Sequence, residues 1–264
     1  MKMKKALRRR AIAATVAIAS VVLLAGLSMS ARIRARFYKS PNSAPQTVLW
    51  AWERPTDLRF IAPDRVAVAF LAKSISLKDD RVVVRPRLQP LNLPPSTKVI
   101  AVARIETDRH ATAELSASQR EQTARAIAEM ATLPRVSEIQ IDFDATTSER
   151  QFYRGLIAGV RAQLPAAVRL SITALASWCS GDDWISDLQI DEAVPMLFRM
   201  AGDGKQIASQ LDRGEDFAAA PCRYSYGVSL DEPRPRLVSS RRVFYFNPEA
   251  WTEESVREIL ESPK

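Results

Sequence analysis

The sequence predicts an α/β protein built as a (β/α)8 TIM-type barrel whose ring of units is incomplete or distorted. Eight short apolar segments recur along the chain, and several are separated by segments with helical spacing. The strands are apolar on both faces, as parallel strands covered by helices are. A doubly wound sheet is the main competitor, but the chain has only eight glycines and no GxGxxG phosphate turn.

The first residues read as an export signal rather than as part of the barrel. Residues 1–10 are basic, residues 11–30 are apolar or small, and Ser28 and Ser30 suit cleavage before Ala31. The apolar run is also long enough to span a bilayer, so residues 1–30 are either a cleaved signal peptide or an N-terminal membrane anchor. Both place the rest of the chain outside the cytoplasm, in the periplasm or anchored to the inner membrane facing it. Residues 31–46 are expected to form a linker and residues 47–264 the barrel domain.

The formal charge of +8 belongs to this leader. Ten of the 38 Lys and Arg residues lie in residues 1–40, which hold no acidic residue, so residues 41–264 contain 28 basic and 30 acidic residues. We therefore expect no nucleic-acid partner. One histidine and no CxxC motif argue against a metal site, and no cofactor is expected.

The two cysteines, Cys179 and Cys222, permit one disulfide in an oxidising compartment, with two separate thiols as the alternative. Cys179 follows the fifth strand and Cys222 precedes the seventh, so they start near opposite ends of a barrel. A bond requires the loop GEDFAAAPC to carry Cys222 to the other end.

Each element follows from its apolar pattern and its end signals. Helices are expected where capping residues precede apolar residues at helical spacing: Ser116 or Ser118 before one helix, Ser148 before the next and Thr252 before the last. Pro195 predicts a bulge or an edge in the sixth strand. The expected strands cover residues 48–52, 65–74, 98–108, 136–146, 168–179, 191–201, 222–233 and 241–251, with a hairpin at 74–87; the expected helices cover 116–134, 148–165, 182–188, 205–214 and 252–262.

The stretch VSEIQIDFDAT, residues 136–146, is a buried strand that ends in acid. Because successive side chains of a strand alternate, Gln140, Asp142 and Asp144 share the face opposite Ile139, Ile141 and Phe143. Burying carboxylates costs several kcal/mol unless they are paired. The pair therefore indicates a functional floor at the carboxyl end of a barrel, with helix capping or arginine pairing as the structural alternative.

Polar and aromatic residues recur at the other strand ends, which converge on one mouth in a barrel. Carboxylates and aromatic faces are typical of sugar sites. A carbohydrate ligand is therefore expected, with these binding residues: Trp50, Trp52, Glu53, Arg104, Glu106, Trp178, Arg199, Asp231 and Asn247.

Glycoside hydrolysis needs one acid to protonate the leaving oxygen and a second group on the other face of the sugar. We expect Asp144 to be the proton donor and Asp142 to modulate it, since a neighbouring negative charge raises a carboxyl pKa. Nucleophilic alternatives are poorer, because His110 is the only histidine and no GxSxG motif is present.

The runs IQIDFDAT, RLSITALASWC, DEAVPMLFRM and FYFNPEAW resemble a bacterial family catalogued as domain of unknown function 3142, a name that implies no activity. QIDFD is also similar to the DxDxE strand of family eighteen chitinases, whose last acid donates the proton. This chain departs from that motif at two positions, Gln140 for the first acid and Asp144 for the glutamate. The leader, the residues at the strand ends and the chitinase-like strand together lead us to expect an exported glycoside-hydrolase-like barrel that acts on or binds an envelope or extracellular polysaccharide. The alternative is a non-catalytic barrel that serves as a polysaccharide- or protein-binding scaffold.

Overall fold

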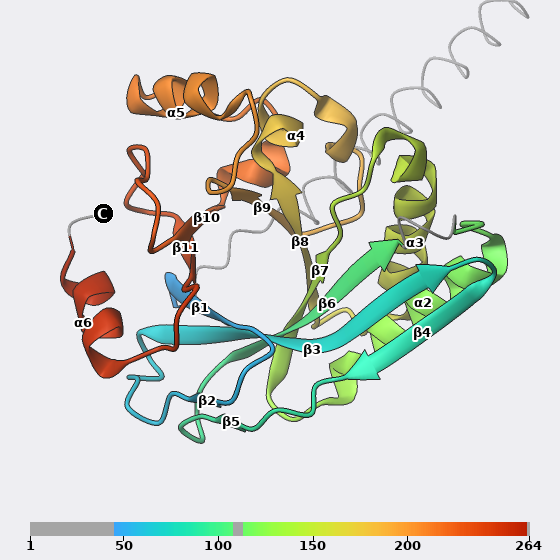
Figure 1. Ribbon diagram of the computed structural model, residues 1–264, viewed down its shortest axis with the longest axis horizontal. Helices are drawn as coiled ribbons and strands as arrows, with labels where there is room; N and C mark the ends of the chain where they lie inside the picture. Colours follow the sequence, from blue (N-terminus) through green and yellow to red (C-terminus); the bar gives the residue numbers. More distant parts are fainter. Residues whose placement is uncertain (1–44, 108–112, 263–264) are drawn as a thin grey trace, which may run out of the picture. The chain divides into compact units, whose positions relative to one another are not determined.

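Eight parallel strands close into a ring in this computed structural model, which describes residues 45–107 and 113–262 (Figure 1). Neighbours follow the order β1, β11, β10, β9, β8, β7, β6 and β3, and β3 pairs back onto β1. The (β/α)8 fold class predicted from the sequence is therefore confirmed. The ring strands are β1 (Thr47–Ala51), β3 (Val66–Lys78), β6 (Val99–Thr107), β7 (Val136–Asp142), β8 (Arg169–Leu175), β9 (Glu192–Met196), β10 (Ser225–Ser229) and β11 (Arg242–Phe246).

The helices around the ring are incomplete, as the short sequence predicts. No helix separates β1 from β3, where residues 52–65 form only the two-residue strand β2, and none lies within residues 230–241, between β10 and β11. In Figure 1, α2 and α3 lie side by side outside β6 and β7. The helices are α2 (Ala117–Ala128), α3 (Arg150–Gln163), α4 (Ala176–Ser180), α5 (Gly204–Asp212) and α6 (Glu253–Glu261), with short 3-10 turns at Glu129–Thr132, Thr147–Glu149, Asp183–Ile185 and Ala220–Arg223.

A long hairpin replaces the helix between β3 and β6. β4 (Arg81–Pro86) pairs antiparallel with the end of β3, and Asp79 forms the turn with φ of 49°. β2 (Thr56–Asp57) and β5 (Leu91–Asn92) pair with each other beside the ring. This excursion is the hairpin that the alternation around Asp79 and Asp80 predicts.

The capping residues identified in the sequence mark the first turns of α2 and α6. Ser116 forms a capping box with Gln119 at α2, and Thr252 forms one with Ser255 at α6. The expected cap at Ser148 is wrong, because Thr146 instead forms the capping box with Glu149, two residues earlier. The predicted strand 168–179 also ends early, at Leu175, and its last residues form α4.

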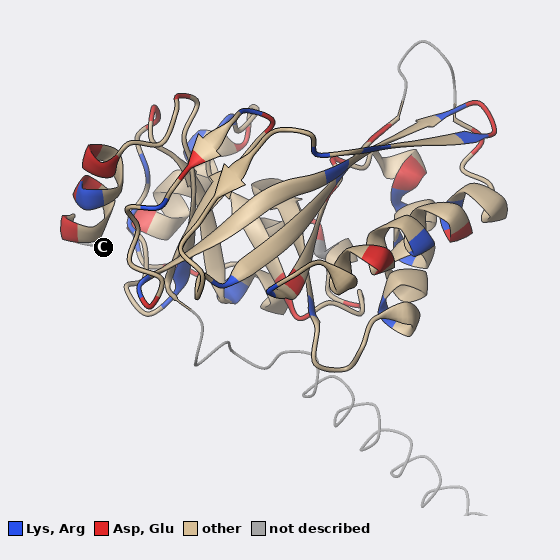
Figure 2. Ribbon diagram, turned by 90° about the horizontal axis from the view of Figure 1, so that it is seen from below, with Lys and Arg blue, Asp and Glu red and all other residues tan. Residues whose placement is uncertain are grey.

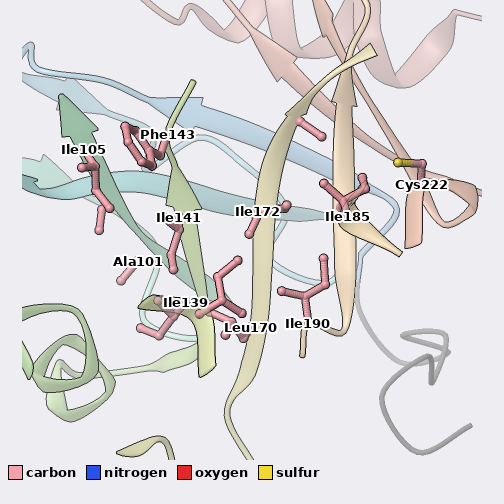
Figure 3. Close-up of a cluster of buried hydrophobic side chains, with 14 of the residues drawn as sticks. Ala101, Ile105, Ile139, Ile141, Phe143, Leu170, Ile172, Ile185, Ile190 and Cys222 are labelled. Carbon is pink, nitrogen blue, oxygen red and sulfur yellow. The ribbon is translucent and has the colours of Figure 1, made fainter. Parts of the chain in front are cut away.

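The main core lies outside the ring, between the strands and the helices. Figure 3 shows Ile139, Ile141 and Phe143 of the β7 segment within this apolar cluster, beside residues of β6 and β8. Their alternation with inward-facing Gln140 and Asp142 is the pattern read from the sequence. Charged residues lie mostly on loops and helices rather than on the strands (Figure 2).

Side chains also fill the inside of the ring. A second apolar cluster is centred on Trp50, whose indole N–H donates to Gln140 Oε1 at 2.8 Å. Gly227 of β10 makes room for this ring, since a Cβ there would lie 2.8 Å from Trp50 Cη2. The bulge or edge expected at Pro195 is wrong, because β9 lies between β8 and β10 and keeps a continuous register with β8 through Pro195, although it pairs with β10 only between Met196 and Gly227.

A buried ionic cluster occupies the amino-terminal end of the ring. Arg242 Nη1 lies 3.2 Å from Glu138 Oε2 and 2.6 Å from Glu192 Oε2. Arg169 lies 3.6 Å and 3.5 Å from the same two carboxylates. Burial raises the pKa of Glu192, and the charge of Arg242 opposes the rise. Charges at this end therefore serve the structure, which leaves the opposite end open for a site.

The predicted leader, residues 1–30, and all but the last two residues of the predicted linker lie outside the described residues, as does His110. In the part of the chain that the structure describes, no helix has both the length and the apolarity needed to cross a bilayer.

Candidate functional site

A cavity of about 420 Å³ opens at the carboxyl ends of the ring strands. Parallel strands bring their last side chains to this one mouth, as in other barrels of this class. Six of the predicted site residues line it: Trp50, Trp52, Arg104, Asp142, Asp144 and Arg199.

Asp142 is the last residue of β7, and its side chain turns into the mouth. Its Oδ1 accepts a hydrogen bond from Thr173 Oγ1 of β8 at 2.7 Å. Burial raises the pKa of Asp142, and the charge of Asp144 adds to the rise, against the Thr173 hydrogen bond and the charge of Arg104. A carboxyl in this position binds its proton more tightly than one in water.

Asp144 lies two residues further, at the rim of the mouth. The residue is exposed to solvent, yet protein partly surrounds its carboxyl. That partial burial raises the pKa of Asp144, and the charge of Arg104 opposes it. Within residues 45–107 and 113–262, no hydrogen bond or ion pair holds this carboxyl, so it is free to meet a ligand.

Arg104 of β6 contacts Glu106, Asp142 and the aromatic ring of Trp52. Its Nε donates to Glu106 Oε1 at 2.8 Å, and its Nη1 lies 4.0 Å from Asp142 Oδ2. The guanidinium also lies over the Trp52 ring, 5.8 Å from its centroid. Arg104 is therefore committed to protein partners, although it borders the cavity.

Aromatic side chains form the opposite wall. Phe198 and Phe246 stack with ring centroids 5.6 Å apart and planes within 2° of parallel. The ring centroid of Trp50 lies 6.3 Å from that of Phe198, and the buried Trp50 side chain forms the floor of the cavity. Flat apolar surfaces of this kind suit the C–H faces of a sugar ring.

A second hollow of about 460 Å³ adjoins the first and is more polar. It shares Arg104, Asp142 and Asp144 with the first cavity and adds Glu106 and Glu149. The acidic pair thus lies where the two hollows meet.

Four predicted site residues do not line either hollow, and each has a local reason. Trp178 is only 3% exposed, because the chain has already entered α4 and its ring packs edge-on against Trp184. Glu53 accepts from the Ser74 hydroxyl at 3.0 Å, and Asp231 accepts from the Ser229 hydroxyl. Asn247 closes its own loop, accepting from the Glu249 N–H at 2.9 Å.

The structure adds lining residues that the sequence reading missed: Thr173, Phe198, Asp203 and Phe246. Thr173 and Phe246 could have been found, since each lies on a ring strand in phase with its inward-facing neighbours. Phe198 and Asp203 lie in the loop after β9, where no periodicity applies.

Cys179 and Cys222 form a disulfide with Cα atoms 5.9 Å apart. The segment before β10 reaches α4 at the mouth, where the Ala219 N–H donates to the Cys179 carbonyl at 3.0 Å. The bond therefore ties the loops that follow β8 and β9 to each other, beside the cavity.

Comparisons with known proteins identify a family match for part of this chain. No curated protein matches the sequence. The solved chitinase domain of the spore coat protein CotE from Clostridium difficile aligns at 15% identity with a TM-score of 0.41, covering 69% of this chain and 65% of that one. Residues 96–202, which run from just before β6 to the loop beyond β9 and contain Asp142 and Asp144, match the sequence model of the family described as Domain of unknown function (DUF3142), so the family resemblance is confirmed over this segment.

Proposed function

We propose that this protein is an exported glycoside-hydrolase-like barrel that acts on an envelope or extracellular polysaccharide. The observation that carries the proposal is a mouth cavity of about 420 Å³ in which two carboxyls face an aromatic wall. Carboxyls supply the acid and base of glycoside hydrolysis, and aromatic rings hold the sugar.

Asp144 is the proton donor in this proposal. Its carboxyl has a raised pKa, is reachable from solvent and has no fixed partner among the described residues, which are the properties of an acid that must give up a proton to a substrate. Asp142 is the modulator, held in place by Thr173. The charge of Asp144 adds to the rise in the pKa of Asp142 that burial causes.

The test is Asp144→Asn, assayed for release of reducing ends from a panel of neutral and acidic glycans. Hydrolysis should be abolished while the melting temperature stays close to that of the wild type, because the rim carboxyl holds nothing together. Asp80→Asn, an exposed acid at the tip of the β3–β4 hairpin, is the matched control and should keep full activity. Wild-type activity in Asp144→Asn would reject the assignment.

A non-catalytic, polysaccharide- or protein-binding barrel is the second candidate, and Gln140 favours it. The first acidic position of the DxDxE motif is filled here by an amide that serves the fold, accepting the Trp50 indole N–H at 2.8 Å. A pure binding module would bind a glycan of the panel, cut none, and bind equally well as Asp144→Asn.

The proposed location is outside the cytoplasm, in the periplasm or on the membrane through an uncleaved N-terminal segment. The basic and apolar leader supports it, and so does the disulfide, which persists in oxidising compartments. Mass spectrometry of the mature N-terminus, combined with cell fractionation, separates cleavage from anchoring. Recovery of the uncleaved chain in the cytoplasm would contradict export.

A further inference from the structure

Arg199 is held in an unusual way at the edge of the mouth cavity. It lies in the loop after β9 with φ of 50°, a backbone region that non-glycine residues seldom occupy. Its backbone N–H donates to both carboxylate oxygens of Glu232, at 3.1 and 3.0 Å. Two loops, after β9 and after β10, therefore fix where this side chain starts.

The guanidinium of Arg199 packs on an aromatic ring but forms no ion pair with a carboxylate of the described residues. It lies over the Phe246 ring, 5.3 Å from the centroid, and Phe246 is itself stacked on Phe198. Glu232, the nearby acid, is used by the Arg199 backbone and makes no ion pair with its side chain. Within the described part of the chain, the Arg199 side chain has no carboxylate partner, whereas Arg104 is paired with Glu106.

From this arrangement we infer that Arg199 recognises an acidic group on the saccharide, so that the ligand is an anionic polysaccharide. This rests on the proposed function of the mouth as a sugar site. A guanidinium offers a planar fork of N–H donors that matches the oxygens of a carboxylate or a sulfate. The stacked rings of Phe246 and Phe198 hold the Arg199 guanidinium in one orientation, and its N–H groups remain available to the ligand.

The carboxyls that line the cavity act against this inference and must be tested with it. Asp203 borders the cavity at the start of α5 and, like Asp142 and Asp144, would repel an anionic ligand. If Asp203 rather than Arg199 selected the ligand, the mouth would prefer a cationic amino sugar. The two residues thus make opposite predictions about the sign of the ligand's charge.

The experiment measures binding of the full chain to matched glycan pairs by titration calorimetry. Oligogalacturonate and its methyl ester differ only in a free carboxylate, and dextran sulfate and dextran differ only in sulfate, so the two pairs also separate the two sources of charge. Chitosan oligomers provide the cationic arm. We expect tighter binding of one anionic member than of its neutral partner, and a loss of tenfold or more for that member in Arg199→Gln.

The controls separate recognition from folding. Arg199→Lys keeps the charge but not the fork and should lose part of the affinity. Arg199→Gly relieves the backbone strain and should be at least as stable as the wild type while binding as poorly as Arg199→Gln. Arg125→Gln removes an exposed arginine of α2 that pairs with Glu121, and should change nothing.

Two results overturn the inference while the proposed function stands. One is equal weakening of neutral and anionic binding in Arg199→Gln. The other is Asp144-dependent cleavage of a neutral glycan with no preference for its charged counterpart. Preferred binding of chitosan, abolished by Asp203→Asn, would reverse the inference. If no glycan binds the wild type, both the inference and the proposed function fail.

Discussion

Replacing Gly227 by alanine tests how tightly the inside of the ring is packed beneath the mouth. The added Cβ would lie 2.8 Å from Cη2 and 3.3 Å from Cζ3 of Trp50, and 3.4 Å from the Pro195 carbonyl oxygen. Carbon atoms in good contact are about 3.5–4.0 Å apart, so the indole must move by roughly 0.7 Å or more. That movement is resisted by the hydrogen bond to Gln140 and by packing on Phe244, whose ring centroid is 5.3 Å away.

The expected cost follows from these contacts. Overpacking a filled core costs about 1–3 kcal/mol, and loss of the indole hydrogen bond adds about 1 kcal/mol. Alanine recovers about 0.5–1 kcal/mol, because glycine is the less favourable residue within a strand. The net loss is about 2 kcal/mol, which lowers the melting temperature of a domain of this size by about 4–8 °C.

Thermal unfolding followed by circular dichroism measures the loss, and a double-mutant cycle assigns it. Trp50→Phe removes the ring atoms that the new methyl group would strike, so the double variant should be more stable than the sum of the two single effects allows, by about 1 kcal/mol. Gly202→Ala is the matched control, because nothing lies within 4 Å of a Cβ built there. Wild-type stability of Gly227→Ala, or strict additivity in the cycle, would refute the packing argument.

Three further predictions concern charge and covalent structure. Arg242→Met should destabilise the fold by about 3–5 kcal/mol at pH 7, since it leaves two buried glutamates without their main partner. The deficit should shrink in acid as Glu192 binds a proton, because burial raises the pKa of this residue; a pH-independent loss in urea titrations would contradict this. Burial raises the pKa of Asp142, so the folded state binds this proton more tightly than the unfolded state and loses stability as the pH rises above the ordinary value of 3.8. Asp142→Asn should therefore melt higher than the wild type at pH 7, with the gain disappearing below pH 3.8, and a lower melting temperature at pH 7 would show that the carboxylate is stabilising. Replacing Cys179 and Cys222 by alanine removes a disulfide between residues 43 positions apart and should lower the free energy of unfolding by about 4 kcal/mol on a chain-entropy estimate. If a reductant leaves the melting temperature of the wild type unchanged, the disulfide does not stabilise the fold.

The parts of the site that could be predicted are those fixed by strand alternation. Once residues 136–146 are read as a strand, the period of two places Asp142 and Asp144 together, and a parallel ring carries them to the mouth. The same logic reaches Trp50 and Arg104, which lie in phase on β1 and β6. Local sequence also identifies the caps at Ser116 and Thr252, because capping is a contact between residues three apart.

The site residues that the sequence did not predict correctly lie beyond the ends of strands, where the alternation of side chains stops. The run LSITALASWC is apolar throughout, and such a run does not reveal that the chain changes from β8 to α4 after Leu175. Trp178 therefore points into the core instead of the mouth. Phe198 and Arg199 are placed by a loop whose course depends on Glu232, 33 residues further along the chain. Contacts of that range have no local signature in the sequence.

Gln140 explains how the ring can keep two acids at its mouth. It occupies the position directly below Asp142 on the same face of β7, where it accepts the indole N–H of Trp50 without carrying charge. An aspartate there would place a third negative charge beside Asp142, in a layer with no arginine, and would raise the pKa of Asp142 further at a cost in stability. The arginines nearest to this layer already have partners: Arg104 above it is paired with Glu106, and Arg242 below it is bound to the two glutamates. The uncharged amide thus separates the structural charges at the base of the ring from the carboxyls at its mouth.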